Sequence, residues 1–366
     1  MLDKSLLATS PCGIVINEVL RDAKLKNASD IHIEPTEHDV QIRFRIFGEM
    51  TLPQKNIPKF LQDVFLSDLK KILGLSIAIS GRPQDSRASF NEHGIDVRAN
   101  LLPTIYGEKV VLRILDLGRN FKLSSVGFSN QTVEDLKLAL EELNGVILIS
   151  GPTGSGKTTT LYSLLNELGP QRKNIVTLED PVEYRLKGMN QVQISPKISF
   201  GQGLRAILRQ DPDIILVGEI RDEETADLCF KAASTGHLVL STIHANGARE
   251  VCERLEKLGV EKYLLKSNLR FSAAQKLLPK ICENCSSTIG SAEKARVLKP
   301  TPGCNKCVGG ITGRIPILEY LDKKAVADYF DDKRPHEFIH VRNFNEQYVR
   351  LVELGLVDAG GLCEYN

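Results

Sequence analysis

The sequence predicts an α/β protein in which a small α+β domain precedes a larger domain built on a parallel sheet. Two observations support this prediction. Helical and strand patterns alternate over the first 118 residues, as expected of a small domain with a mostly antiparallel sheet. Further along, short apolar runs rich in Ile, Val and Leu are separated by helical stretches, which is typical of a parallel sheet with helices on both faces. These runs are 146–150, 175–178, 214–217 and 238–242.

The first domain is expected to cover residues 1–118. An amphipathic helix is predicted near its start, over residues 13–27, with an apolar side formed by Ile16, Val19, Leu20 and Ala23. In the later strand "DVQIRFRIFGEM" alternate residues share a face, so Arg43 and Arg45 lie opposite the apolar side chains. A second helix is expected from about Lys59 to Leu73, followed by strands near 87–91, 94–101 and 108–115.

A linker is predicted over residues 119–129, because "LGRNFKLSSVGFSN" is polar and contains glycine. The second domain is then expected to span residues 130–366. It includes a cysteine-bearing segment at about 279–314 and a helical C-terminal tail. A chain of 366 residues is long enough to bury two or three cores.

The composition is that of an ordinary cytoplasmic protein. The net charge of +1 argues against a chain that mainly coats nucleic acid or anionic membrane. No apolar run approaches the roughly 20 residues of a membrane-spanning helix, and the N-terminus lacks a signal-peptide layout. The eight cysteines are therefore expected to be thiols or metal ligands rather than disulfides.

The segment "GPTGSGKT" has the spacing G-x-x-x-x-G-K-T and lies between an apolar strand and a helix. Glycines let successive backbone N–H groups turn toward phosphate oxygens, and the following helix adds its positive end. Lys157 is expected to reach the β- and γ-phosphates of ATP, and Thr158 to ligate Mg²⁺. The alternative, a glycine-rich turn, is disfavoured by the flanking strand and helix. The predicted nucleotide-binding residues are Gly151, Pro152, Thr153, Gly154, Ser155, Gly156, Lys157, Thr158 and Thr159.

Glu219 follows the buried strand 214–217. A P-loop protein needs a carboxylate at the end of a neighbouring strand to organise magnesium or to orient the attacking water, and Glu219 occupies that position. The preceding residue, where an aspartate is usual, is Gly218. Magnesium would then rely on Thr158, water and another acid, unless the nearby acids are merely solvated loop residues. The candidates are Glu179, Asp180 and Glu183.

His237 and His244 flank the fourth apolar strand. A histidine beside apolar residues is often a satisfied core group. His244 could equally sense the γ-phosphate, since imidazole offers hydrogen-bond reach and a pKa near neutrality. The residues alone leave both interpretations open.

Four cysteines form the pattern C-x₂-C-x₁₈-C-x₂-C. Each pair can grip one metal from a tight turn, and four thiolates suit tetrahedral Zn²⁺. A redox pair and an iron–sulfur cluster are the alternatives. Because four thiolates leave no open position, the zinc is expected to be structural. The ligands would be Cys282, Cys285, Cys304 and Cys307.

Taken in order, these segments resemble the secretion and type IV pilus ATPases, the hexameric motors of type II secretion and pilus assembly. The resemblance spans roughly residues 13–320. In the second domain it rests on "GPTGSGKT" (151–158), "TLEDPVEY" (177–184), "LRQDPDIILVGEIRD" (208–222) and "STGHLVLSTIHAN" (234–246). In the first domain it rests on "ASDIHIEP", "VQIRFRI", "PQDSRASF" and "LLPTIYGEKVVLRIL".

The resemblance implies a PAS-like N-terminal domain followed by a RecA-like P-loop ATPase domain with a zinc-binding insertion. It further implies that Glu219 is the general base and that Glu183 helps to set the metal and the water. Arg98 and Arg113 fall where the family has arginine fingers, which neutralise phosphate charge. The alternative for both arginines is a solvent-facing position on a strand.

At the level of function, the resemblance implies a cytoplasmic homohexamer, peripheral to the inner membrane, that hydrolyses ATP to assemble pilus or pseudopilus fibres. The implied partners are an inner-membrane platform protein and a cytoplasmic docking protein. The four-cysteine motif is typical of the assembly and secretion branch rather than the retraction motors. Longer members carry a further N-terminal domain, and the chain is expected to begin without it.

The sequence disfavours three other functions. A nucleotide-controlled adaptor that scarcely hydrolyses ATP is disfavoured by the presence of Lys157 and Glu219. A retraction-type motor is disfavoured by the four cysteines. A nucleic-acid motor on the same fold is disfavoured by the near-neutral charge and by the absence of a basic stripe with interleaved aromatic residues, so no direct nucleic-acid partner is expected.

Overall fold

The computed structural model describes residues 9–116, 121–288, 296–298, 303–304, 307–331 and 341–359. The chain divides into two compact units. The first unit comprises Met1–Arg119 with Pro300–Thr312, and the second comprises Asn120–Lys299 with Gly313–Asn366. Residues 119 and 120 of the predicted linker lie outside the described part, whereas Phe121 and Leu123 are buried in the core of the second unit.

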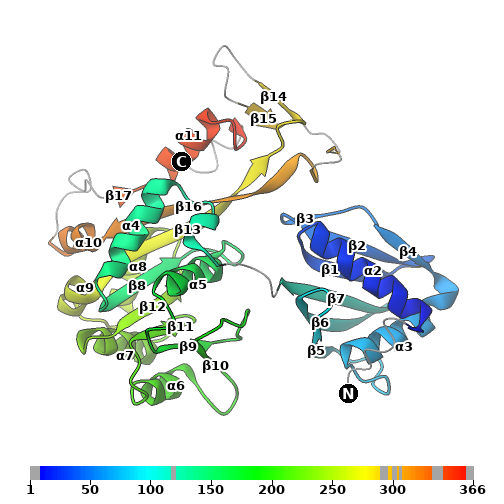
Figure 1. The fold of residues 1–366 in the computed structure, drawn as a ribbon, viewed down its shortest axis with the longest axis horizontal. Coiled ribbons are helices and arrows are strands. Elements are labelled where there is room, and N and C mark those ends of the chain that lie inside the picture. The colour runs from blue at the N-terminus through cyan, green and yellow to red at the C-terminus, as the bar shows by residue number, and fades with distance from the viewer. Residues whose placement is uncertain are drawn as a thin grey trace. The chain divides into compact units, whose positions relative to one another are not determined.

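The first unit is built on an antiparallel sheet with the strand order β3-β2-β1-β7-β6-β5, in which β4 also pairs with β2 (Figure 1). The three strands predicted after the second helix are β5, β6 and β7, each longer than expected at one or both ends. The strands are β1 (Ala28–Pro35), β2 (Asp39–Ile46), β3 (Glu49–Met50), β4 (Lys55–Pro58), β5 (Gln84–Phe90), β6 (Ile95–Thr104) and β7 (Gly107–Asp116).

Two helices, α2 (Pro11–Leu25) and α3 (Gln62–Leu73), pack on the apolar side of this sheet. Helix α2 begins two residues before the predicted position, because Ser10 Oγ accepts the Gly13 N–H at 2.9 Å and a proline opens the first turn. Residues 59–61, expected to start the second helix, form a short 3₁₀ turn instead. Strand β2 alternates buried and partly exposed residues as predicted, so Arg43 and Arg45 lie on the polar face.

The second unit is built on a sheet with the strand order β10-β9-β11-β12-β8-β13-β16-β17. Its pairings from β10 to β13 are parallel, as the sequence predicts. Strand β12 lies between β8 and β11, and the carboxyl ends of these strands meet at one edge of the sheet (Figure 1). The four predicted apolar runs are β8 (Gly145–Ser150), β9 (Ile175–Glu179), β11 (Ile214–Val217) and β12 (Leu238–Ile243).

Helices cover both faces of this sheet. Because successive strand residues point to opposite faces, neighbouring residues of one strand pack into different cores. Ile147 and Ile149 of β8 pack into one core with α4 (Asn130–Glu141) and α5 (Lys157–Glu167). Val146 and Leu148 pack into the other core, with α6 (Phe200–Ile207), α7 (Glu223–Ser234), α8 (Ala248–Lys257), α9 (Lys262–Asn268) and α10 (Lys323–Phe330). Within the described residues, no helix combines the length and apolar character needed to cross a membrane.

Several strands of the second unit were not predicted. The long strands β13 (Leu269–Ile281) and β16 (Ile311–Asp322) are neighbours in the sheet, and the cysteine-bearing segment connects them. The tail contains α10 and α11 (Phe344–Glu353), and residues beyond 359 lie outside the described part. The remaining elements are η2 (Leu123–Ser125), β10 (Asn190–Gln193), β14 (Ser286–Thr288), β15 (Arg296–Leu298) and β17 (Val341–Arg342).

Candidate functional site

The predicted phosphate-binding loop joins β8 to α5 at the carboxyl edge of the sheet. Gly151 has a φ of +138° and Gly156 a φ of +89°, conformations that residues with a side chain rarely adopt. Space is also short at Gly151, where a Cβ would lie 2.3 Å from the carbonyl oxygen of Gln275. The glycines of the motif are thus required by the backbone, which turns tightly before α5 begins at Lys157.

Lys157 projects into this loop. Its Nζ donates hydrogen bonds to the carbonyl oxygens of Gly151, at 2.8 Å, and Pro152, at 2.9 Å. Burial lowers the pKa of Lys157 below its ordinary value, while the carboxylates of Glu219 and Glu183 act in the opposite direction. An ammonium group held near two acids and hydrogen-bonded to the loop backbone is well placed to exchange these contacts for phosphate oxygens.

A cavity of about 390 Å³ opens beside the loop. It brings together Lys157, Thr158, Glu183, Glu219 and His244, which come from four separate segments of the sequence. Thr153 and Gly154 of the loop also line it, whereas the other predicted loop residues form the backbone turn and the start of α5 without lining the cavity. Those residues are Gly151, Pro152, Ser155, Gly156 and Thr159.

Glu219 lies just beyond the end of β11, with a side chain that is only 14% exposed. Its carboxylate pairs with Arg221 and lies 3.5 Å from His244 Nε2. The hydrogen bond from Arg221 to Glu219 raises the pKa of Arg221. His237, in contrast, contacts the carbonyl oxygen of Ala232 at 2.9 Å and does not line the cavity. Arg221 was missed by the sequence analysis, although it is only two residues from Glu219.

The close approach of strand β9 accounts for a glycine, rather than the usual aspartate, at position 218. A Cβ at this position would lie 3.2 Å from the Leu178 carbonyl oxygen and 3.3 Å from Glu179 Cα, both backbone atoms of the neighbouring strand β9. The Gly218 N–H also donates to the Leu178 carbonyl at 2.7 Å, which fixes this close approach. A residue with a side chain would require the backbone here to shift by a few tenths of an ångström.

Glu179, the last residue of β9, is the most buried of the three candidate acids, with 5% of its surface exposed. Three donors satisfy its carboxylate: Tyr162 Oη of α5, Thr177 Oγ1 at 2.6 Å and Gln191 Nε2 at 3.1 Å. Glu179 therefore connects the helix that follows the phosphate-binding loop to β9. Glu183, two residues after the Asp180–Pro181 pair, lines the cavity.

Arg98 and Arg113 belong to the first unit, on the neighbouring strands β6 and β7. They lie directly opposite each other, and Asp30 of β1 lies opposite Arg113 on its other side. Residues opposite each other on adjacent strands share a face of the sheet. Arg113 Nε donates to Asp30 Oδ1 at 3.1 Å. Their contact with phosphate stays a prediction.

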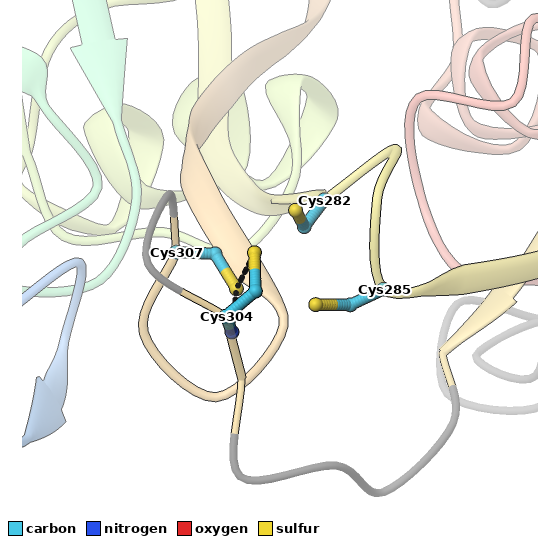
Figure 2. Close-up of side chains that lie close together, drawn as sticks. All are labelled: Cys282, Cys285, Cys304 and Cys307. Carbon is cyan, nitrogen blue, oxygen red and sulfur yellow. Dashed lines mark hydrogen bonds between the residues drawn. The ribbon is translucent and has the colours of Figure 1, made fainter.

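The four paired cysteines converge, as Figure 2 shows. One ligand atom from each lies within 4.8 Å of the others. Cys304 Sγ and Cys307 Sγ are 3.6 Å apart, close to the separation of about 3.8 Å that tetrahedral Zn–S bonds of about 2.3 Å require. The backbone N–H of Cys304 also donates to Cys307 Sγ at 3.2 Å. This donor set and geometry are compatible with zinc. Part of the predicted segment 279–314 lies outside the described residues.

Comparison with known proteins gives the same family as the motifs. A family model described as "Type II/IV secretion system protein" matches residues 6–355. The chain belongs to this family. A relative from Escherichia coli K12, the putative type II secretion system protein E, is 43% identical over 332 residues, which are 86% of this chain and 67% of that protein. The type IV pilus assembly ATPase PilB of Thermus thermophilus is 41% identical over 326 residues, 84% of this chain.

The chain spans only part of these family members, about two thirds of the E. coli protein and 36% of the Thermus protein. Solved structures resemble it over nearly its full length. The pilus retraction motor PilT with bound ADP has a TM-score of 0.67 at 26% identity and covers 96% of each chain. The Legionella pneumophila ATPase DotB has a TM-score of 0.75 at 22% identity, covering 96% of this chain and 95% of that one, and shows a shared fold.

Proposed function

We propose that this chain binds ATP in the cavity beside residues 151–158 and hydrolyses it. The observation that carries the proposal is the convergence of Lys157, Thr158, Glu183 and Glu219 on one cavity. A phosphate-binding loop, a hydroxyl that can ligate a cation and a carboxylate at a strand end are the parts that phosphoryl transfer to water requires. The names of the relatives, which include a pilus assembly ATPase, support the same activity.

The cavity suits a nucleotide with a magnesium ion. Thr158 and the carboxylates of Glu183 and Glu219 present the oxygen ligands that Mg²⁺ prefers, beside the ammonium group of Lys157. When bound, the ion would neutralise phosphate charge. In this proposal Glu219 accepts the proton of the attacking water, and Lys157 leaves the loop carbonyls to hold the phosphates. His244, 3.5 Å from Glu219, responds to the γ-phosphate.

In the second part of the proposal, Arg98 and Arg113 contact the phosphates in a closed state of a homohexamer. The support is the face of the sheet that they share on the first unit, where Arg113 is exposed and Arg98 half-buried, and the position of the family's arginine fingers. An arginine supplied by another domain ties hydrolysis to domain movement, because its contact exists only in the closed state. The four cysteines hold a structural zinc ion, since four thiolates leave no position for substrate.

The machine that we propose assembles a pilus or pseudopilus. Relatives named for type II secretion and for type IV pilus assembly support this role. The chain would act at the cytoplasmic side of the inner membrane, through a platform protein and a docking protein.

Steady-state ATP turnover against protein concentration tests the proposal, for the wild-type chain and Glu219→Gln. A motor that works as a hexamer should show a rate per subunit that rises with concentration, and Glu219→Gln should lose it while still binding nucleotide. Nucleotide binding with negligible turnover at every concentration would instead support a nucleotide-controlled adaptor.

A further inference from the structure

Gln275 lies at an unusual position on β13. The preceding residue, Ala274, pairs with Ser150, the last residue of β8 before the phosphate-binding loop. The register therefore carries Gln275 past the end of its strand partner and against the loop itself. Its surface is only 1% exposed, which is rare for glutamine unless its amide is hydrogen-bonded.

Both ends of the Gln275 amide are hydrogen-bonded to the loop segment. Its Nε2 donates to the carbonyl oxygen of Ser155 at 2.7 Å. Its Oε1 accepts from Thr160 Oγ1, in the first turn of α5, also at 2.7 Å. One side chain thus joins the last part of the loop to the helix that follows it.

The loop also packs closely on Gln275. A Cβ on Gly151 would lie 2.3 Å from the Gln275 carbonyl oxygen, and one on Gly156 would lie 2.9 Å from its Nε2. Two glycines of the motif are therefore needed partly to make room for this residue. Gln275 contacts the beginning, the end and the following turn of the loop.

We propose that Gln275 is a positioning residue of the nucleotide site, which holds the phosphate-binding loop in its open curve before a nucleotide arrives. The inference rests on the proposed function, in which this loop binds ATP. A loop that is free to sample other shapes presents its N–H groups in the right direction for only part of the time. The apparent dissociation constant then rises in inverse proportion to the population of the competent loop that remains.

The test is the dissociation constant of a fluorescent ADP analogue with Mg²⁺, measured for the full chain and for variants. Gln275→Ala should bind about tenfold more weakly, as expected if the competent loop is populated about one tenth of the time. Gln347→Ala is the matched control. Gln347 likewise bridges backbone groups of the second unit, accepting from Leu318 N at 3.2 Å and donating to Leu318 O at 2.8 Å, and does not line the cavity.

Gln275→Glu adds a second measurement, the pH dependence of nucleotide affinity, which a purely structural role of Gln275 would not change. As a carboxylate it has no donor for the Ser155 carbonyl, whereas the protonated acid can donate one hydrogen bond. Its affinity, relative to the wild type at the same pH, should therefore improve from about pH 8 to about pH 5.5, as the carboxyl group approaches its titration range. This variant also decides the question if Gln275→Ala does not fold.

Three outcomes would overturn the inference: Gln275→Ala within about twofold of the wild type, equal losses for Gln275→Ala and Gln347→Ala, or no pH-dependent recovery of Gln275→Glu. Lys157→Ala separates these from failure of the proposed function. If Lys157→Ala binds the analogue as tightly as the wild type, the loop is not the nucleotide site. If Lys157→Ala loses binding and Gln275→Ala does not, only the role of Gln275 is wrong.

Discussion

Two glutamates, one in each unit, have similar surroundings at first sight. Glu34 of β1 is 17% exposed and pairs with Arg43, at 2.6 Å, and Lys109, at 2.6 Å. Glu219, after β11, is 14% exposed and pairs with Arg221 and, at 3.5 Å, with His244. Each acid is mostly removed from solvent, and each has basic partners; Glu34 also lies 3.9 Å from Nδ1 of His32 on its own strand.

The partners differ in how firmly they are held. Arg43 and Lys109, which pair with Glu34, lie on the neighbouring strands of its own sheet and are 34% and 33% exposed. Those of Glu219 follow strand ends and are 60% and 67% exposed. Arg221 and His244 can therefore swing away at little cost, whereas Arg43 and Lys109 cannot. The first arrangement stabilises a sheet, and the second keeps a carboxylate available for a ligand.

The sharpest test of this difference is the same acid-to-amide change at both positions. Glu219→Gln should lower ATP turnover at least ~100-fold, because general base catalysis typically contributes that much, and should leave the free energy of unfolding nearly unchanged. Glu34→Gln should cost about 1–3 kcal/mol of stability, since it weakens charged hydrogen bonds that are partly buried. Turnover assays and urea unfolding measure the two effects. Equal losses of stability would remove the distinction between the two acids.

The four cysteines offer a third case, in which four thiolates would bind one zinc ion instead of pairing with basic side chains. Cys304→Ser should reduce bound zinc from about one ion per chain to well below half, because a structural site uses all four thiolates. Elemental analysis of the purified chain measures the zinc. Ser286→Ala is the control, since it leaves the hydrogen bond from the Ser286 backbone N–H to the Cys282 carbonyl in place. Unchanged zinc in Cys304→Ser would contradict a four-thiolate site.

A pH titration of stability should separate Glu34 from its amide variant. Burial by itself would raise the pKa of Glu34, but hydrogen bonds and charges from Lys109 and Arg43 outweigh it and hold the pKa below the ordinary 4.5. The folded state thus holds this proton less tightly than the unfolded state. The contribution is present above pH 4.5 and is lost as the pH falls through the folded pKa. Urea midpoints of the wild type and Glu34→Gln should therefore converge in acid; a constant gap would speak against the ion pairs.

Arg221→Ala should have the smallest effect. An exposed partner is screened by water, so the change in stability should stay within about 1 kcal/mol. Turnover should fall by less than ~10-fold, because Glu219 itself remains and a tenfold change corresponds to only about 1.4 kcal/mol. A loss as large as that of Glu219→Gln would place Arg221 among the groups that touch the nucleotide.

Many of the strands could be predicted from the local pattern of apolar and polar residues. The alternation in β2 and the apolar runs of β8, β9, β11 and β12 identified strands because each pattern reflects burial on one or both faces. Strand β13 escaped prediction, since "LRFSAAQKLLPKI" mixes small, polar and charged residues. Its buried polar residues have partners that are distant in the sequence. Gln275, for example, donates a hydrogen bond to the Ser155 carbonyl in the loop after β8.

The same reasoning applies to the candidate site. Lys157, Thr158 and Glu219 were identified because their spacing and their places at strand ends follow from phosphate chemistry. Arg221 and Tyr162 were not, since their contacts with Glu219 and Glu179 depend on how the chain returns to one edge of the sheet. Arg98 and Arg113 lie in a different unit, where register alone shows that they face the same way.

The segment with the cysteines leaves the sheet from β13 and rejoins it at β16, and these strands are adjacent. A connection between adjacent strands can become longer or shorter without shifting either strand. Each doubling of its length adds only about 0.6 kcal/mol to the free energy of closing the loop. The nucleotide cavity has no such freedom, because it draws on the ends of several strands at once. An insertion or deletion in the cysteine segment should therefore leave the sheet in place, whereas a change in the shape of the cavity has to involve several strand ends together.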